Sequence, residues 1–287
     1  MTLFTSPEQT AGALATTGYL ADSAIATTVF LADALGKPLL LEGPAGVGKT
    51  ELAKAVAAAT GAELIRLQCY EGLDEARALY EWNYKKQLLR IQAAGDASWE
   101  STHDDIFTDE FLLERPLLAA IRREGPTVLL IDETDKADVE VEGLLLEVLS
   151  DFQVTIPELG TITAVHRPFV VLTSNAAREL SEALKRRCLY LHLEYPTLER
   201  ERDIVLSRVP DLEAGLAEQL VKVVGTLRSL EVKKPPSIAE TIDWARTLLA
   251  LGRDTLDEGT VRATLGVVLK HVADQQRAVK ELHLDGR

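Results

Sequence analysis

The stretch Gly43-Pro44-Ala45-Gly46-Val47-Gly48-Lys49-Thr50 decides the fold of this 287-residue chain. It has the G-x-x-x-x-G-K-[ST] spacing of a phosphate-binding P-loop. The apolar residues 38–41 before it predict a short buried strand, and residues 51–60 after it predict a helix that ends at Gly61. Glycines let the backbone N–H groups of such a loop approach phosphate oxygens, and the positive end of the following helix points at the same phosphates.

The residues of this loop have separate expected roles. All eight residues from Gly43 to Thr50 are predicted to bind the nucleotide. Lys49 is expected to reach the β- and γ-phosphates, and the Thr50 hydroxyl is expected to ligate magnesium. The motif therefore predicts a nucleotide with these phosphates and Mg²⁺ as the cofactors, and the family resemblance described below implies that the nucleotide is ATP.

The composition limits the class of protein. At 287 residues the chain is longer than a typical single domain, so we expect one large and one smaller domain. Lys and Arg total 31 against 45 for Asp and Glu, and the net charge of −14 argues against wrapping a nucleic-acid backbone. Cys69 and Cys188 form neither a disulfide framework nor a metal-ligand spacing. Because no signal peptide and no apolar run of about 20 residues are visible, we expect a soluble, cytoplasmic protein without a membrane span.

Residues 127–133 form the second decisive element. The run Val128-Leu129-Leu130-Ile131 is apolar throughout, which is typical of a strand buried on both faces of a parallel sheet. Asp132 and Glu133 stand at its carboxyl end, where open α/β sheets bind their ligands. We expect Asp132 to hold magnesium through water, and Glu133 to orient and deprotonate the attacking water. The alternative is a pair of strand-end carboxylates that face solvent.

The next segment, Asp135-Lys136-Ala137-Asp138, resembles the NKxD box that reads guanine in GTPases. It follows the acidic strand directly, with no strand of its own, and Asp135 stands where that box has Asn. We therefore reject a guanine site and interpret Asp138 as the N-cap of a helix over residues 139–150.

A further buried strand is predicted over residues 169–175, after a β-hairpin over residues 152–165. Asn175 ends this strand, and its amide can both donate and accept hydrogen bonds. It could therefore hold the attacking water or a γ-phosphate oxygen. Asn at a strand end is also common in turns, so the functional interpretation depends on its position after the acidic strand.

Residues 70–110 are unusually aromatic for a chain with 5% aromatic residues. Helical spacing over residues 73–92 predicts one helix with an apolar stripe, which would pack on the core. The alternative interpretation is an inserted arm that contacts a partner protein. The stripe consists of Ala76, Tyr80, Tyr84, Leu88 and Ile91.

Beyond residue 195 the sequence predicts helices only. The predicted fold class is therefore α/β, with a parallel sheet flanked by helices and an additional all-helical C-terminal domain. We expect a flexible segment over residues 1–16, a nucleotide-binding core over 17–195 and a helical lid over 196–287. The four helices expected in the lid cover residues 197–209, 212–230, 237–251 and 258–282.

The order of these motifs resembles that of AAA+ ATPases, and the resemblance extends from about residue 18 over nearly the whole chain. The hairpin also stands where several AAA+ branches carry one. LLLEVL at residues 144–149, followed by FQV at 152–154 and SEAL at 181–184, resembles the MoxR family. CYEGLDEA at 69–76 and YEWNY at 80–84 resemble the MoxR branch associated with maturation of carbon monoxide dehydrogenase.

The resemblance implies a role for each matching position. Residues 43–50 correspond to the Walker A motif, Asp132 and Glu133 to the Walker B motif, and Asn175 to sensor 1. In this family the chain would form a P-loop AAA+ core followed by a helical lid. Lys49, Glu133 and Asn175 would then act in catalysis, while Thr50 and Asp132 would hold magnesium.

Members of the family also carry an arginine finger and a sensor 2 arginine. Arg187 matches the arginine finger that enters a neighbouring subunit's site, with Arg186 as the second candidate. A planar, permanently charged guanidinium suits the charge of a transferring phosphoryl group; the alternative is that both side chains are solvated surface charges. The sensor 2 arginine of relatives has no match, because Ile238 stands near that position. The role is either missing or taken over by Lys233, Lys234 or Arg246.

The leading functional hypothesis is an ATP-hydrolysing ring of MoxR type, a hexamer that remodels or matures a partner protein. The resemblance implies a partner with a von Willebrand factor A domain and a client metalloenzyme. One alternative is a nucleotide-gated binding scaffold with little turnover, against which Glu133 and Arg187 argue. A second alternative is a DNA-handling AAA+ protein such as a clamp loader or helicase, against which the acidity of the chain argues.

Overall fold

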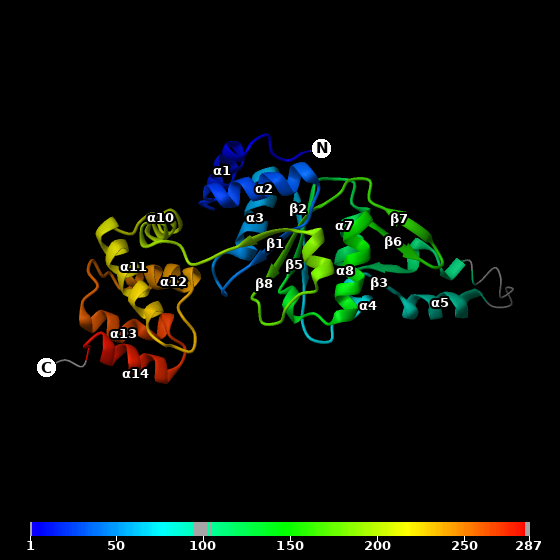
Figure 1. Cartoon of the computed structure of the whole chain (residues 1–287). Coiled ribbons are helices and arrows are strands. Elements are labelled where there is room, and N and C mark those ends of the chain that lie inside the picture. The colour runs from blue at the N-terminus through cyan, green and yellow to red at the C-terminus, as the bar shows by residue number, and fades with distance from the viewer. Residues whose placement is uncertain (1, 95–102, 104, 285–287) are drawn as a thin grey trace. The chain divides into compact units, whose positions relative to one another are not determined.

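The computed structural model describes residues 2–94, 103 and 105–284 and divides into two compact units (Figure 1). The first unit contains residues 1–17, 21–42 and 49–192, and the second contains residues 18–20, 43–48 and 193–287. No helix among the described residues has the length and apolar character needed to cross a membrane.

The centre of the first unit is a sheet of five parallel strands in the order β2-β5-β8-β1-β9. Every residue of β5 and β8 is buried, as expected from their apolar sequences. The predicted α/β fold with a parallel P-loop sheet is therefore confirmed. The strands are β1 (Leu39–Glu42), β2 (Glu63–Gln68), β5 (Thr127–Asp132), β8 (Phe169–Ser174) and β9 (Leu189–His192).

Helices cover both faces of this sheet, with α2 and α3 on one side and α7 and α8 on the other (Figure 1). Right-handed crossovers explain this arrangement, because the chain runs from β1 to β2 in one direction and then returns across the sheet in the other. Helix α3 ends before Gly61, which has a left-handed φ of 65°, as predicted. The helices are α2 (Ser23–Leu35), α3 (Lys49–Thr60), α7 (Pro116–Arg122), α8 (Val139–Asp151) and α9 (Glu182–Arg187).

The N-terminal residues differ from the expectation of a flexible segment, because they include helix α1 (Pro7–Thr16). Ser6 caps this helix by accepting a hydrogen bond from the backbone N–H of Gln9. Phe4 and Leu14 are 2% and 0% exposed. Burial of these apolar side chains, together with the cap, orders a segment whose small and polar composition suggested otherwise.

The aromatic segment does not form the single helix predicted over residues 73–92. The chain leaves the helical conformation because Trp82, in β3, pairs with Leu112 in β4 as part of an antiparallel ladder. Tyr80 packs against the core, but Tyr84 and Leu88 are 62% and 59% exposed, so the stripe as a whole does not pack there. The elements are α4 (Glu75–Ala78), β3 (Tyr80–Trp82), α5 (Tyr84–Ala94), the 3-10 helix η1 (Asp109–Phe111) and β4 (Leu112–Glu114), and Trp99 lies outside the described residues.

The predicted β-hairpin is present as the antiparallel strands β6 (Gln153–Ile156) and β7 (Gly160–Thr163). Val154 and Ile156 are buried, whereas Thr155 between them is exposed. This alternation is that of a two-stranded ribbon with one face on the core.

The second unit is a helical bundle with its own core, in which Trp244 is fully buried and donates its indole N–H to Thr264. The helix predicted over residues 258–282 is two helices, with the break after Val268. The helices are α10 (Leu198–Arg208), α11 (Ala214–Ser229), α12 (Ile238–Ala250), α13 (Glu258–Val268) and α14 (Val272–Glu281).

A buried ion pair connects three elements of this unit. Arg228 in α11 donates two hydrogen bonds, of 2.5 and 2.8 Å, to the carboxylate of Glu201 in α10. The Arg228 Nε also donates to the carbonyl of Pro236 at 2.7 Å, just before α12, and its guanidinium lies 4.3 Å from the ring centroid of Tyr195. Because the Glu201 side chain is 0% exposed, either charge alone would be costly to bury.

We predict that Glu201→Ala lowers the free energy of unfolding of the second unit by about 3 kcal/mol, because it leaves the Arg228 charge without its carboxylate. Urea unfolding measures the loss, followed by the fluorescence of Trp244 in chains whose other two tryptophans, Trp82 and Trp99, are replaced by phenylalanine. The control is Glu218→Ala, which removes an exposed partner of Lys222 and is expected to cost less than about 0.5 kcal/mol. Equal losses in the two variants would contradict a special role for the buried pair.

Candidate nucleotide site

The loop from Gly43 to Gly48 has a conformation that depends on glycine. Gly43 and Gly46 have φ values of 152° and 75°. A Cβ atom on Gly43 would lie 2.0 Å from the carbonyl oxygen of Leu193, and one on Gly46 would lie 2.2 Å from the Cβ of Ser237. These neighbours belong, like the loop, to the second unit, and the chain passes from Gly48 directly into α3.

Lys49 and Thr50 open helix α3. The Lys49 amine is buried, at 6% exposed, and donates a hydrogen bond of 2.8 Å to the Oδ1 atom of Asn175. Burial lowers the pKa of Lys49, while the charges of nearby carboxylates, first of all Asp135, oppose this shift. Asn175 follows directly on β8, so the P-loop lysine and the predicted sensor lie together.

Asp132, the last residue of β5, is 3% exposed and fully engaged. Its Oδ1 atom accepts hydrogen bonds from the hydroxyls of Thr50, at 3.0 Å, and Thr173, at 2.6 Å. Its Oδ2 atom forms an ion pair of 2.5 Å with Arg66 of β2.

This arrangement fits a magnesium ion. A hydroxyl and a carboxylate oxygen within 3.0 Å of each other are the hard donors that Mg²⁺ prefers. The part of the chain that the structure describes holds no cluster of three or more His, Cys, Asp or Glu residues suited to a metal ion. A magnesium ion on Thr50 and Asp132 would therefore need further ligands from phosphate oxygens and water, as is usual for Mg²⁺ beside a nucleotide.

Glu133 has a left-handed backbone conformation, with φ of 57°, which is uncommon for a residue with a side chain. Its N–H donates to the Thr173 hydroxyl at 2.9 Å. Its Oε2 atom accepts hydrogen bonds from Gln68 Nε2, at 2.9 Å, and Lys136 Nζ, at 2.8 Å. The carboxylate predicted to act as a base is thus held by two donors in this structure.

The partners of Asp132 and Glu133 could not be predicted directly from the sequence. Gln68 stands opposite Asp132 in the parallel register of β2 and β5, and Arg66 lies on the same side of β2, two residues earlier. Arg66, which binds Asp132, also donates a hydrogen bond to Gln68, which binds Glu133. The partners of the two acidic residues therefore contact each other. Strand alternation identifies the side of β2, but the adjacency of β2 and β5 is visible only in the structure.

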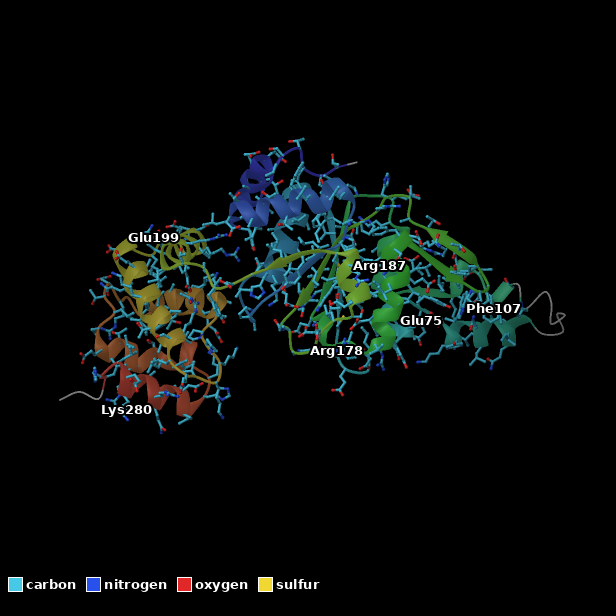
Figure 2. The ribbon with its side chains drawn as sticks, viewed as in Figure 1. Glu75, Phe107, Arg178, Arg187, Glu199 and Lys280 are labelled. Carbon is cyan, nitrogen blue, oxygen red and sulfur yellow. The ribbon has the colours of Figure 1, made fainter. Side chains whose placement is uncertain are left out.

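Arg187 is not part of this cluster. It lies on α9 beside α8 (Figure 2), where its Nε donates to Ser150 Oγ at 2.8 Å and its Nη1 donates to the Ala183 carbonyl at 3.0 Å. Both Arg187 and its alternative, Arg186, are exposed.

The position expected for a sensor 2 arginine is occupied by Ser237 and Ile238. Ser237 is the N-cap of α12 in a capping box with Glu240, and the Ile238 N–H donates to the Gly46 carbonyl at 3.2 Å. The three proposed substitutes have other contacts. Lys234 pairs with Glu240, Arg246 pairs with Asp243, and the Lys233 backbone N–H donates to Asp274.

The five-stranded parallel sheet, with Lys49, Thr50, Asp132, Glu133 and Asn175 at one edge, defines a P-loop nucleotide-binding protein of the AAA+ fold. Comparison with known families agrees, because residues 38–188 match the model described as the AAA domain of the dynein-related subfamily. This match covers more than half of the chain. The chain therefore belongs to the dynein-related AAA family.

Individual relatives are similar at lower identity. The gas vesicle ATPase GvpN of Haloferax mediterranei is 28% identical over 203 residues, which cover 68% of this chain and 57% of that protein. The denitrification regulatory protein NirQ of Pseudomonas aeruginosa is 24% identical, over 83% of this chain and 91% of that protein. A RuvB variant from Thermotoga maritima has a similar structure, with a TM-score of 0.49 and 19% identity over 99% of this chain and 73% of that chain. The family match and the relative that is named as an ATPase support nucleotide hydrolysis in general terms.

We predict that Thr173→Val lowers the free energy of unfolding of the first unit by about 1–3 kcal/mol. Valine has a similar shape but no hydroxyl, so Asp132 loses a donor and the Glu133 N–H loses its acceptor. Thermal and urea unfolding measure the loss. Thr155→Val, at an exposed position of the hairpin, is the control with an expected change within about 0.5 kcal/mol; an equally small change at Thr173 would contradict the prediction.

Proposed function

We propose that this chain is an ATP-hydrolysing AAA+ protein of MoxR type, which remodels or matures a partner protein. The observation that carries the proposal is a pair of hydrogen bonds, from the buried Lys49 to Asn175 and from Thr50 to the buried Asp132, with Glu133 next to Asp132 in the chain. These five side chains come from three segments of the chain and meet at the carboxyl edge of the sheet, where α/β proteins bind their ligands.

Each residue has a role in this proposal. Residues 43–50 would bind the triphosphate, and Thr50 with Asp132 would hold magnesium, which neutralises phosphate charge when it is bound. Glu133 would accept a proton from the attacking water, and Asn175 would orient that water or a γ-phosphate oxygen. Gln68 and Lys136 both donate to the Oε2 atom of Glu133 in this structure, so the proton of the attacking water would go to Oε1, or to Oε2 once these donors are exchanged for water.

We further propose a ring, with six subunits, in which Arg187 completes the site of a neighbouring subunit and Arg186 is the alternative. Exposure of both arginines supports this, since a residue that acts on another subunit must lie at the surface of its own. A guanidinium is suited to the task because it stays charged and donates in a fixed plane.

For the partner we propose a protein with a von Willebrand factor A domain and, as client, a metalloenzyme such as carbon monoxide dehydrogenase. This part is supported by the MoxR-like segments of the sequence. Two relatives carry names that refer to gas vesicles and to denitrification, so their names do not point to the partner or the client proposed here. We propose the cytoplasm as the location, since Cys69 and Cys188 are both free thiols in the structure.

A nucleotide-gated scaffold with little turnover is the second candidate, and one observation favours it. Glu133 is bound by two donors, so a protein that kept this arrangement with nucleotide bound would hydrolyse slowly. Steady-state ATP turnover, with and without the partner protein, separates the two candidates: the scaffold stays slow in both conditions.

We predict that Glu133→Gln still binds ATP but hydrolyses it on the order of 100-fold more slowly, because the amide cannot accept the proton of water. Turnover is measured by phosphate release, and binding by a fluorescent ATP analogue. Lys49→Ala is the matched control, with nucleotide binding itself expected to be lost. Normal turnover in Glu133→Gln would remove Glu133 as the base.

We also predict that ATPase activity per subunit rises with protein concentration, because an arginine supplied by a neighbour is present only in the oligomer. The measurement is turnover across a dilution series, with the oligomeric state followed by light scattering. Arg187→Ala should lower the activity of the oligomer without changing its size. Equal activity per subunit in a verified monomer would remove the finger from the mechanism.

A further inference from the structure

Asn175 is followed by an uncommon turn. Ala176 has a φ of 57°, in the left-handed region that residues with a side chain rarely adopt. Its N–H donates to the Ser174 hydroxyl at 3.0 Å, which supports the turn from the strand side. A turn of this kind persists only where its surroundings hold it in place.

The second support comes from Asp135, in the 3-10 helix η2 (Thr134–Lys136) that directly follows the acidic pair. The Oδ2 atom of Asp135 accepts the N–H of Ala177 at 2.9 Å. Asp135 is 4% exposed, and its other carboxylate oxygen has no hydrogen-bond partner among the described residues. Burying a carboxylate is costly, and this one accepts a hydrogen bond from a single backbone N–H. We therefore interpret the Asp135 carboxylate as holding the Ala177 amide in place.

The charge of Asp135 also acts on Lys49. Of the carboxylates that oppose the lowering of the Lys49 pKa, Asp135 is the strongest, ahead of Asp132 and Glu133. Lys49 in turn donates to Asn175 at 2.8 Å. Asp135 thus influences Asn175 from two directions: through the backbone two residues further on, and through the cation that the Asn175 amide contacts.

We propose that Asp135 is a positioning residue for Asn175, which it serves by holding the Ala176–Ala177 turn so that the Asn175 amide stays directed at Lys49. Asp135 does not itself touch the nucleotide in this proposal. The structural part of the proposal stands on its own, and its consequence for hydrolysis rests on the proposed function.

The structural part is tested by amide hydrogen exchange of the full chain. In Asp135→Ala the exchange of the Ala177 amide should rise at least about tenfold, because the amide loses its acceptor. Asp135→Asn keeps an oxygen acceptor and should retain most of the protection, although a neutral acceptor binds less strongly than a charged one. The control is Asp138→Ala, three residues further along, whose carboxylate accepts from Gly72 instead; the Ala177 amide should not respond to it.

The kinetic part is tested by a double-mutant cycle. Asp135→Ala should lower kcat about tenfold or more while the affinity for a fluorescent ATP analogue changes less than about threefold. If Asp135 acts through Asn175, then Asp135→Ala combined with Asn175→Ala should have a kcat within about threefold of Asn175→Ala alone. A residue that only stabilises the fold would lower kcat by the same factor in both backgrounds.

The outcomes separate the two proposals. Unchanged Ala177 exchange in Asp135→Ala overturns the inference whatever the activity, and so do kcat losses that multiply in the cycle. A wild-type chain without ATPase activity in which Ala177 still responds to Asp135→Ala removes the proposed function and leaves the turn support in place. If Asp135→Ala does not fold, Asp135→Asn is the variant that tests the positioning role. A large loss of kcat in Asp135→Asn, with the Ala177 amide still protected from exchange, would show that the charge of Asp135 matters and would overturn the positioning role.

Discussion

Three carboxylates stand within four consecutive residues at the end of β5, and the site is organised by the need to balance them. Asp132 and Asp135 are almost completely buried, and Glu133 is about two-thirds buried. Like charges at this spacing repel one another, and burying them is costly, unless cations and hydrogen-bond donors compensate. Each neighbouring element contributes to this compensation: α3 and β2 each supply a cation, η2 supplies one, and β8 supplies the Thr173 hydroxyl. The cations are Lys49, Arg66 and Lys136.

These cations are not equivalent. The side chains of Arg66 and Lys136 are each 49% exposed, so water can solvate them when they leave their carboxylates. Lys49 is buried, and moving it away from the carboxylates would leave charges of both signs without compensation. The site therefore has one fixed positive charge and two exchangeable ones. Under the proposed function, this division would let the site accept a metal ion and a triphosphate while Lys49 stays in place.

The parts of the fold that local pattern determines could be predicted from the sequence. Continuous apolar runs identified the buried strands β5 and β8, and the glycine spacing identified the loop before α3. The partners of the acidic pair, Arg66 and Gln68, could not be predicted, because their proximity depends on which strand lies next to β5. The prediction of a single helix over residues 73–92 was wrong for a related reason. The apolar residues have helical spacing, but Trp82 pairs with a strand about 30 residues further along the chain, and this pairing overrides the local preference. The structure gives the positions of Asn175 and Arg187, but their roles in hydrolysis stay predictions.

In the second unit, the start of α12 is held in place although no arginine stands at the position expected for sensor 2. The N-terminus of α12 is fixed by hydrogen bonds from both sides: Arg228, itself held by the buried carboxylate of Glu201, binds the Pro236 carbonyl, and the Ile238 N–H binds the Gly46 carbonyl. An arginine at this position would respond to phosphate charge, whereas a backbone hydrogen bond responds to the position of the loop. In this chain, movement of Gly46 would therefore act on the start of α12 directly, and the buried ion pair would pass that displacement to α10 and α11 because neither of its charges can be left alone.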